Sequence, residues 1–289
     1  MNFSIIGGDA RSVALIRLLE EAGHQIYVYG FTTHIFSKSI IVCSCIEEAV
    51  QKSSIVIGPV PCSQDQVTLF APFHQGDPIE LDILFSLLSD HQTFMAGQLT
   101  IAMQKKINPL VYTVDLLERE ELAVWNAIPT AEGAIQIAME EQPITIHHSC
   151  SLVMGFGRCG KILSHMLKGL GANVSVAVRN SKDAAYISAY GYQPIILQDL
   201  KREIHRFQFI YNTIPHMILD HRLLLYVNKD CLIIDLASKP GGVDYEAAEK
   251  LGLNAMLCLS LPGKVAPTTA GWIIKETVLN ICEEMRGDK

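Results

Sequence analysis

The sequence predicts an α/β fold made of two Rossmann-like domains, each with a doubly wound parallel sheet, and a cleft between the domains. Short apolar runs alternate with segments of helical period from end to end, which is typical of parallel sheets covered by helices. Each half of the chain opens with a strand-like run followed by a glycine turn. The length of 289 residues is sufficient for two domains of ordinary size.

The first half is predicted to be an α/β domain over residues 1–126. A helix over Ala10–Ala22 ends at Gly23, since glycine commonly terminates helices. The segment Gly58–Ser63 contains two prolines, which exclude it from a central strand. It is therefore a loop at the carboxyl edge of the sheet, where such folds bind ligands. The predicted strands are Phe3–Ile6, Gln25–Tyr29, Ser54–Ile57 and Thr93–Ala96.

A helical pattern runs from Thr113 to about Glu141 and is the predicted connection between the domains. We expect a break at Asn126–Thr130, because Pro129 disfavours a helical conformation in the residue before it. Thr130 is then expected to cap the helix that follows.

The second half, residues 127–266, repeats the alternation of strands and helices. Helices are predicted over Arg158–Leu170 and Ala184–Tyr190, each followed by a glycine. A long amphipathic helix over Thr268–Arg286 lies within a final segment, residues 267–289, which we expect to pack back near the interdomain region. The predicted strands are Leu152–Met154, Asn173–Val178, Phe207–Tyr211, Cys231–Leu236 and Asn254–Leu259.

The composition excludes several classes of protein. A net charge of −7 makes nucleic acid a poor partner. The eight cysteines include no C-x-x-C pair and no zinc spacing, so we expect a reduced cytosolic protein without a metal site. No apolar run reaches the roughly 18 residues of a membrane span, and no signal peptide is recognisable, so we expect no membrane association.

The stretch LVMGFGRCGK, residues 152–161, fits a dinucleotide-binding turn and nearly fits a nucleotide-triphosphate loop. The second interpretation fails because Ile162 stands where Ser or Thr would hold Mg²⁺. In the first, Gly155 permits the turn, Gly157 lets the backbone approach a pyrophosphate, and Gly160 lets helix and strand pack closely. The alternative is a purely structural glycine turn. The expected cofactor contacts here are Gly155, Phe156, Gly157, Arg158, Cys159 and Gly160.

The residue at the end of the next strand indicates which dinucleotide is bound. NAD-binding domains usually place an acid about 20 residues after the glycines, but here the strand ends in Arg179. A guanidinium can bind a 2′-phosphate, helped by Asn180, Ser181 and Lys182. We therefore predict a preference for NADP, with a solvated loop arginine as the alternative. The absent acid also argues against a methyltransferase that uses S-adenosylmethionine.

Three further loops are expected beside the nicotinamide ring, because each follows a strand of the second half. They are Asn212–Pro215, Asp235–Gly242 and Leu261–Pro267. Backbone groups of such loops can orient the ring, and Pro and Gly fix the loop shapes. The expected cofactor contacts in them are Thr213, Ile214, Pro215, Ala237, Pro262 and Gly263.

The same loops supply candidates for catalysis. His216 is a candidate general base, Lys239 and Lys264 are candidates for binding a substrate carboxylate, and Asp235 either takes part in catalysis or orients its loop. In the first half, Arg11 follows a glycine turn at a helix start, which suits an anion. The alternative for each is an ordinary surface or loop residue. Cys159 is either activated by the helix N-terminus or simply packed.

The order of these motifs resembles the A subunit of dipicolinate synthase from spore-forming bacteria. The resemblance is carried by Ile6–Arg11, Asn126–Gly133, the glycine turn, Asn212–Pro215, Asp235–Gly242 and the sequence LPGKVAPTTAG at Leu261–Gly271. It covers essentially the whole chain. More distantly, the layout is similar to that of alanine dehydrogenase.

The resemblance implies synthesis of pyridine-2,6-dicarboxylate from a dihydro- or hydroxytetrahydro-dipicolinate, in the cytoplasm of the mother cell of a sporulating bacterium. It implies a B subunit as partner, and we expect a homo-oligomer as well. The expected substrate contacts are Arg11, Asn126, Thr130, Glu132 and Lys264. Two alternatives stay open: a cofactor-binding subunit that requires its partner for activity, and a dehydrogenase of another small amino or hydroxy acid.

Overall fold

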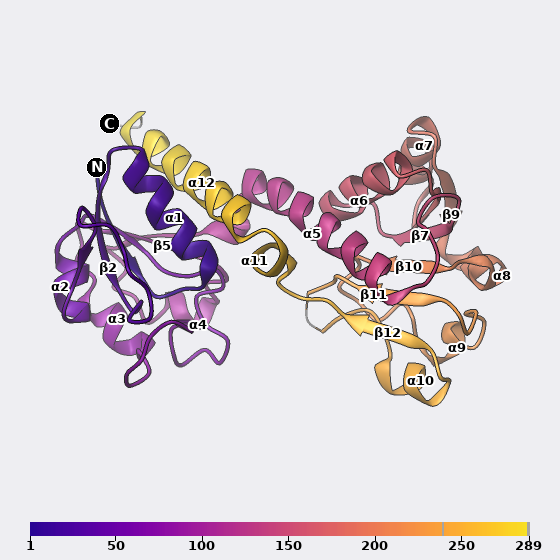
Figure 1. The fold of residues 1–289 in the computed structure, drawn as a ribbon, viewed down its shortest axis with the longest axis horizontal. Helices are drawn as coiled ribbons and strands as arrows, with labels where there is room; N and C mark the ends of the chain where they lie inside the picture. The colour runs from indigo at the N-terminus through magenta and orange to yellow at the C-terminus, as the bar shows by residue number, and fades with distance from the viewer. Residues whose placement is uncertain (239, 288–289) are drawn as a thin grey trace. The chain divides into compact units, whose positions relative to one another are not determined.

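A computed structural model describes residues 1–238 and 240–287, which form two compact units (Figure 1). Unit 1 contains Met1–Trp125 together with the chain from Ala266 onward, and unit 2 contains Asn126–Val265.

Unit 1 contains a six-stranded parallel sheet in the order β3-β2-β1-β4-β5-β6. The crossover beside β1 makes it doubly wound. Its strands are β1 (Asn2–Ile6), β2 (Gln25–Tyr29), β3 (Ile41–Val42), β4 (Ile55–Ile57), β5 (Thr93–Ala96) and β6 (Tyr112–Asp115). Its helices are α1 (Ala10–Glu21), α2 (Ile46–Gln51), α3 (Leu81–Leu87), α4 (Ile101–Gln104), a 3-10 turn at Leu116–Glu118 and α12 (Pro267–Gly287).

Unit 2 repeats this topology in the order β12-β11-β10-β7-β8-β9, again with all neighbours parallel. Its strands are β7 (Cys150–Met154), β8 (Asn173–Val178), β9 (Gln193–Ile196), β10 (Phe209–Asn212), β11 (Leu232–Asp235) and β12 (Asn254–Leu257). Its helices are α5 (Glu120–Glu141), which begins in unit 1, α6 (Arg158–Gly169), α7 (Ser181–Ala189), α8 (Leu200–Glu203), α9 (His221–Leu224), α10 (Tyr245–Lys250) and α11 (Leu261–Val265). The prediction of two doubly wound Rossmann-like sheets is confirmed.

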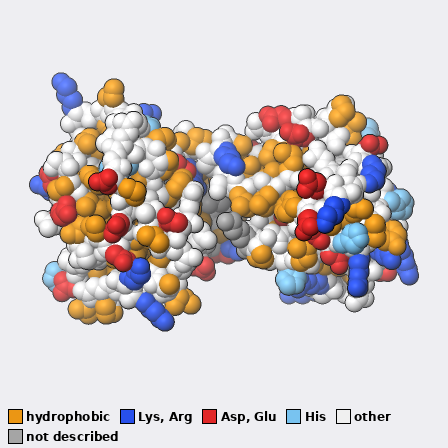
Figure 2. Space-filling view, turned by 90° about the horizontal axis from the view of Figure 1, so that it is seen from below, with side chains coloured by type: hydrophobic (Ala, Val, Ile, Leu, Met, Phe, Trp, Pro, Cys, Tyr) orange, Lys and Arg blue, Asp and Glu red, His pale blue; other side chains and the backbone are white. Residues whose placement is uncertain are grey.

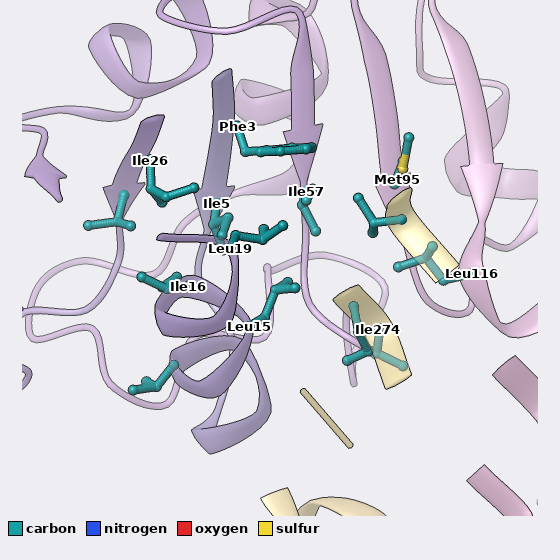
Figure 3. Packing of buried hydrophobic residues seen from close by; sticks show 14 of the residues in the cluster. Phe3, Ile5, Leu15, Ile16, Leu19, Ile26, Ile57, Met95, Leu116 and Ile274 are labelled. Carbon is teal, nitrogen blue, oxygen red and sulfur yellow. The ribbon is translucent and has the colours of Figure 1, made fainter. Parts of the chain in front are cut away.

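The core of unit 1 is formed by one face of the sheet against α1 and α12. Figure 3 shows Phe3, Ile57 and Met95 from three strands on the same side as Leu19 of α1 and Ile274 of α12. Side chains of this kind contribute about 1.5–3 kcal/mol each when fully buried. The C-terminal helix is therefore an integral part of this core.

The helices α1 and α12 lie side by side (Figure 1). Their close approach depends on Gly271, because a Cβ atom there would lie 2.6 Å from the Cβ of Ala14.

The strands that the sequence did not predict, β3, β6 and β9, all lie at sheet edges. Edge strands carry a weak apolar pattern, since one side of each faces solvent. Pro194 lies within β9, and proline is tolerated only where no ladder partner needs its N–H. The prediction that a helix begins at Thr113 was wrong, because Tyr112–Asp115 is an edge strand whose apolar pattern is also weak.

The predicted break at Asn126–Thr130 was also wrong, since α5 runs without interruption through Pro129. Proline removes one backbone donor from the helix, but Ala127, Ala131 and neighbouring small side chains bury the same face. Thr130 is not a cap. Its hydroxyl donates a hydrogen bond of 2.7 Å to the carbonyl of Asn126, one turn earlier.

We had predicted a loop over Leu261–Pro267, but residues Leu261–Val265 form the short helix α11. Pro262 is compatible with a first helical turn, where its missing N–H has no intrahelical partner. The helix packs on α5 at Gly133, where a Cβ atom would lie 3.2 Å from the side chains of Leu261 and Val265.

Acidic and basic side chains are interspersed on the face shown in Figure 2 and do not gather into a basic patch. Among the residues that the structure describes, no helix is both long and apolar enough to cross a bilayer. All eight cysteines are free.

Candidate dinucleotide site in unit 2

The glycine turn connects β7 to α6, and its three glycines differ in their steric surroundings. Gly155 has φ of +96°, a conformation that side chains disfavour, and a Cβ atom there would lie 2.7 Å from Thr213 Oγ1. At Gly160 a Cβ atom would lie 2.2 Å from the carbonyl oxygen of Gly155. At Gly157, a Cβ atom would meet no atom of the described chain within 4 Å. Gly155 and Gly160 are thus required for packing, and Gly157 faces open space.

The N-terminus of α6 faces this space without a side-chain cap. The N-cap residue is Gly157, and the first turn contains no acidic residue. The unpaired N–H groups of a first turn, together with the positive end of the helix dipole, bind phosphate groups.

Two other residues of the turn pack against the protein. Phe156 is buried, and Lys161 Nζ lies 5.5 Å from the centre of its ring. Burial raises the pKa of the Cys159 thiol to about 11, so the thiol is protonated at neutral pH. This supports packing over activation by the helix N-terminus.

The end of β8 carries exposed polar side chains. Arg179, Ser181 and Lys182 are exposed, but Asn180 is the N-cap of α7. Its Oδ1 accepts a hydrogen bond of 2.8 Å from the backbone of Asp183, and its Nδ2 donates one of 2.9 Å to the Asp183 carboxylate. The side chain of Asn180 is therefore engaged in capping.

Asp235 is fully buried at the end of β11. Its Oδ1 accepts hydrogen bonds from Asn212 Nδ2 at 2.8 Å and from Ala237 N at 3.1 Å. Its Oδ2 accepts from Gly242 N at 2.9 Å and from the Tyr245 hydroxyl at 3.0 Å. Burial, and after it the charge of Asp235, raise the pKa of Tyr245 well above its ordinary value. Both carboxylate oxygens of Asp235 are thus occupied by hydrogen bonds within unit 2.

Two side-chain hydrogen bonds fix the loop after β10, one to the end of β7 and one within the loop. Thr213 Oγ1 donates a hydrogen bond of 2.8 Å to the carbonyl of Met154, which joins this loop to the strand before the glycine turn. Asn212 Oδ1 accepts one of 3.1 Å from the backbone of Ile214. His216 and Pro215 are exposed at the end of the loop.

The remaining predicted residues of unit 2 are more widely spread. Lys239 lies outside the described residues. Pro262 and Gly263 are partly buried in α11, and Lys264 on the same helix is exposed. On α5, Asn126 and Thr130 are partly buried, and Glu132 is exposed.

Arg11 lies in unit 1 and is only 8% exposed. Its Nε lies 2.9 Å from Asp9 Oδ1, and its second terminal nitrogen lies 2.7 Å from Asp9 Oδ2. Asp9 also caps α1 by accepting from the backbone of Arg11 at 3.0 Å. The charge of Arg11 is thus met by a two-point ion pair, so it is not a free cation.

Sequence reasoning named the segments that contain Asn212 and Asp235 but missed the bond between their side chains. The two residues are register partners at the ends of neighbouring buried strands. A polar residue at matching ends of adjacent strands is the signal that could have found this pair. Within the described part of the chain, no cluster of three or more metal-binding side chains occurs.

Comparison with known proteins gives consistent results along the chain. The family model for the N-terminal domain of the dipicolinate synthase A subunit matches residues 2–116. The dipicolinate synthase A subunit of Bacillus subtilis (strain 168) is 35% identical over 301 residues, covering 100% of the chain and 98% of that protein. The crystal structure of the dipicolinate synthase A chain from Bacillus subtilis superposes with a TM-score of 0.90 at 33% identity, covering 100% of the chain and 98% of that chain.

A more distant structure, that of an L-alanine dehydrogenase, shares the fold. It has a TM-score of 0.66 at 14% identity and covers 99% of the chain and 90% of its own.

Proposed function

The chain belongs to the family of dipicolinate synthase A subunits, and from this we propose that it is an NADP-dependent oxidoreductase that forms dipicolinate. The proposed substrate is dihydrodipicolinate or its hydroxytetrahydro precursor, and the proposed partner is a B subunit. The proposed place of action is the cytoplasm of a sporulating cell.

The observation that supports a dinucleotide is the glycine turn of unit 2. Gly155 and Gly160 are fixed by packing, whereas a methyl group at Gly157 would project into open space at the uncapped N-terminus of α6. A pyrophosphate fits this combination of space, donors and positive potential. A bound nicotinamide would supply a hydride acceptor.

The preference for NADP rests on the end of β8. Arg179, Ser181 and Lys182 are exposed there, and a guanidinium can bind a 2′-phosphate through two hydrogen bonds. We leave Asn180 out of this proposed contact, because both polar atoms of its side chain are bonded to Asp183 at the start of α7.

The chemistry requires removal of a hydride and a proton from a dihydropyridine ring, and the product gains aromaticity. The protein must hold both carboxylates and present one C–H bond to the acceptor at about 3–3.5 Å. We propose His216 as the proton acceptor, because it is exposed beside the turn at the end of β10 and a neutral imidazole ring has a nitrogen that can accept a proton. Lys264 is the proposed cation for a substrate carboxylate. If the substrate still carries a 4-hydroxyl, water must leave before or during oxidation.

Calorimetric titration with NADP⁺ and NAD⁺ tests the cofactor assignment. Arg179→Ala should weaken NADP⁺ binding by about 10–100-fold, since a hydrogen bond to a charged group contributes about 1.5–3 kcal/mol. Binding of NAD⁺ should change less than about twofold. The control is Arg202→Ala, an exposed arginine on α8 that pairs with Asp199, which should leave both affinities unchanged. Tighter binding of NAD⁺ than NADP⁺ to the unaltered chain would refute the assignment.

A second candidate function is a cofactor-binding subunit without activity of its own. Two observations favour keeping it: Asp235 is saturated by hydrogen bonds, and Arg11 is neutralised by Asp9. An activity assay decides between the two. Dihydrodipicolinate is generated in the assay, and the formation of dipicolinate is measured with the chain alone and with the chain plus the B subunit. Parallel assays of NADP⁺ reduction with small amino and hydroxy acids test the third possibility, a dehydrogenase of such an acid.

A further inference from the structure

We propose that Gln98, in unit 1, is a substrate-binding residue whose side-chain amide donates a hydrogen bond to a carboxylate of the substrate. The inference rests on the proposed function, because it takes a small dicarboxylate as the substrate class. It adds a residue that lies outside every sequence motif considered above.

The backbone of Gln98 is in a conformation that glutamine disfavours. Its φ is +59°, in the left-handed region where a Cβ atom approaches the backbone too closely. Such residues persist only where the surrounding structure enforces them, and they cluster at functional sites. Gln98 lies two residues after β5, which ends at Ala96. It is therefore at the carboxyl edge of the sheet, where ligands bind in this class of fold.

Hydrogen bonds enforce this conformation from one side through Asp115, at the end of the neighbouring strand β6. One carboxylate oxygen accepts from Gln98 N at 2.9 Å, and the other accepts from Leu99 N at 2.7 Å. The first oxygen also accepts from Leu117 N at 2.9 Å. A single carboxylate thus fixes two consecutive peptide groups of the turn.

The loop after β4 holds the turn from the other side. Gly97 N donates to the carbonyl of Pro59 at 3.0 Å, and Cys62 N donates to the carbonyl of Gly97 at 2.6 Å. A Cβ atom at Gly97 would lie 2.6 Å from Val60 Cγ1. The side chain of Leu99 is buried in the core of unit 1, which anchors the end of the turn.

The Gln98 side chain itself takes no part in this framework. It is exposed, and its amide makes no hydrogen bond with any residue that the structure describes. The framework thus fixes the backbone and leaves two N–H donors available. A neutral amide can donate to a carboxylate without the desolvation that burying a charged side chain would require.

The structure describes three other left-handed residues that are not glycine. Gln66 lies in a turn that Ser63 Oγ and Asp65 close, with the backbone of Gln66 donating to Ser63 Oγ at 2.9 Å. His148 precedes β7, at the amino edge of its sheet. Ser260 immediately precedes α11. Gln98 differs from Gln66 and His148 by following a strand directly at the ligand-binding edge.

The test is calorimetric binding of pyridine-2,6-dicarboxylate to the full chain with NADP⁺ present, alone and with the B subunit. Gln98→Glu should weaken dicarboxylate binding by at least about 10-fold, because it replaces a donor by a like charge. Gln98→Gly should weaken binding by about 10-fold while the unfolding temperature stays the same or rises, because glycine adopts this backbone conformation without strain. The matched control is Gln66→Glu, which makes the same change at the same backbone conformation and should change binding less than about twofold.

The outcomes separate the two hypotheses. If the unaltered chain binds the dicarboxylate and the Gln98 variants bind it equally well, the role of Gln98 is wrong and the proposed function stands. If Gln98→Gly lowers the unfolding temperature and spares binding, the residue is purely structural. If the unaltered chain binds no dicarboxylate in either setting, the proposed function fails and the inference fails with it. Affinity for NADP⁺ should be the same in all variants.

Discussion

At the end of β11, the two carboxylate oxygens of Asp235 accept four hydrogen bonds in a site without solvent exposure. Three donors come from the loop that follows and from α10, and one comes from Asn212 on the adjacent strand. A buried charge is tolerated when its hydrogen-bonding capacity is satisfied in this way. The side chain therefore fixes the backbone of Ala237 and of Gly242 relative to β10.

We predict that Asp235→Asn lowers the free energy of unfolding by about 2–4 kcal/mol, because asparagine offers one acceptor oxygen where four donors converge. Urea unfolding followed by circular dichroism measures this. Asp220→Asn is the control, since Asp220 caps α9 by accepting from Leu223 N at 3.0 Å and asparagine caps equally well. A catalytic role alone would instead reduce the turnover number and leave the unfolding midpoint unchanged.

The sequence predicted where candidate residues occur along the chain better than what their side chains contact. Strand ends can be located from apolar runs, so the loops after β10 and β11 were found. The pairing of Arg11 with Asp9 and the capping by Asn180 depend on local rotamers and turns that an apolar pattern does not encode. The left-handed conformation of Gln98 has no sequence signal, because glutamine is not a residue that favours it.

At the scale of elements, the β7–turn–α6 segment shows why a short glycine pattern was informative. Its spacing matches a geometry in which packing requires Gly155 and Gly160, while Gly157 faces open space. The continuity of α5 was not predictable in the same way, since one proline gives a strong local signal for a break. Burial of alanines along one face of α5 stabilises the helix through that position, and such tertiary packing commonly overrides local preference.

We predict opposite results for alanine at two glycines of this turn. Gly157→Ala should lower the free energy of unfolding by less than about 1 kcal/mol, because φ there is −78° and space is open, so the main cost is that alanine is a poorer N-cap than glycine. It should weaken NADP⁺ binding by about 10-fold or more, because the methyl group would occupy the phosphate's approach. Gly160→Ala should instead destabilise the fold by about 1–3 kcal/mol, because its methyl group would overlap the Gly155 carbonyl. Equal loss of stability in both variants would contradict this assignment.

At the scale of the whole molecule, the two units have separate hydrophobic cores. The clusters around Phe3 and Phe94 belong to unit 1, and those around Val153 and Ile210 belong to unit 2. Multidomain chains of this kind commonly depart from two-state unfolding. The glycine turn lies wholly in unit 2, so a ligand bound there should stabilise that unit directly.

The chain contains only two tryptophans, and both are in unit 1, where the rings of Trp125 and Trp272 lie 5.3 Å apart. Tryptophan fluorescence therefore reports the unfolding of unit 1, whereas circular dichroism reports both units. At 100 times its dissociation constant, NADP⁺ should stabilise unit 2 by about 2.7 kcal/mol, which is a rise of roughly 9 °C in its unfolding temperature. We expect thermal unfolding followed by circular dichroism to shift upward and the fluorescence transition to shift by less than half as much. Equal shifts by both probes would mean that the units unfold as one, and a shift in neither would mean that unit 2 does not bind the dinucleotide.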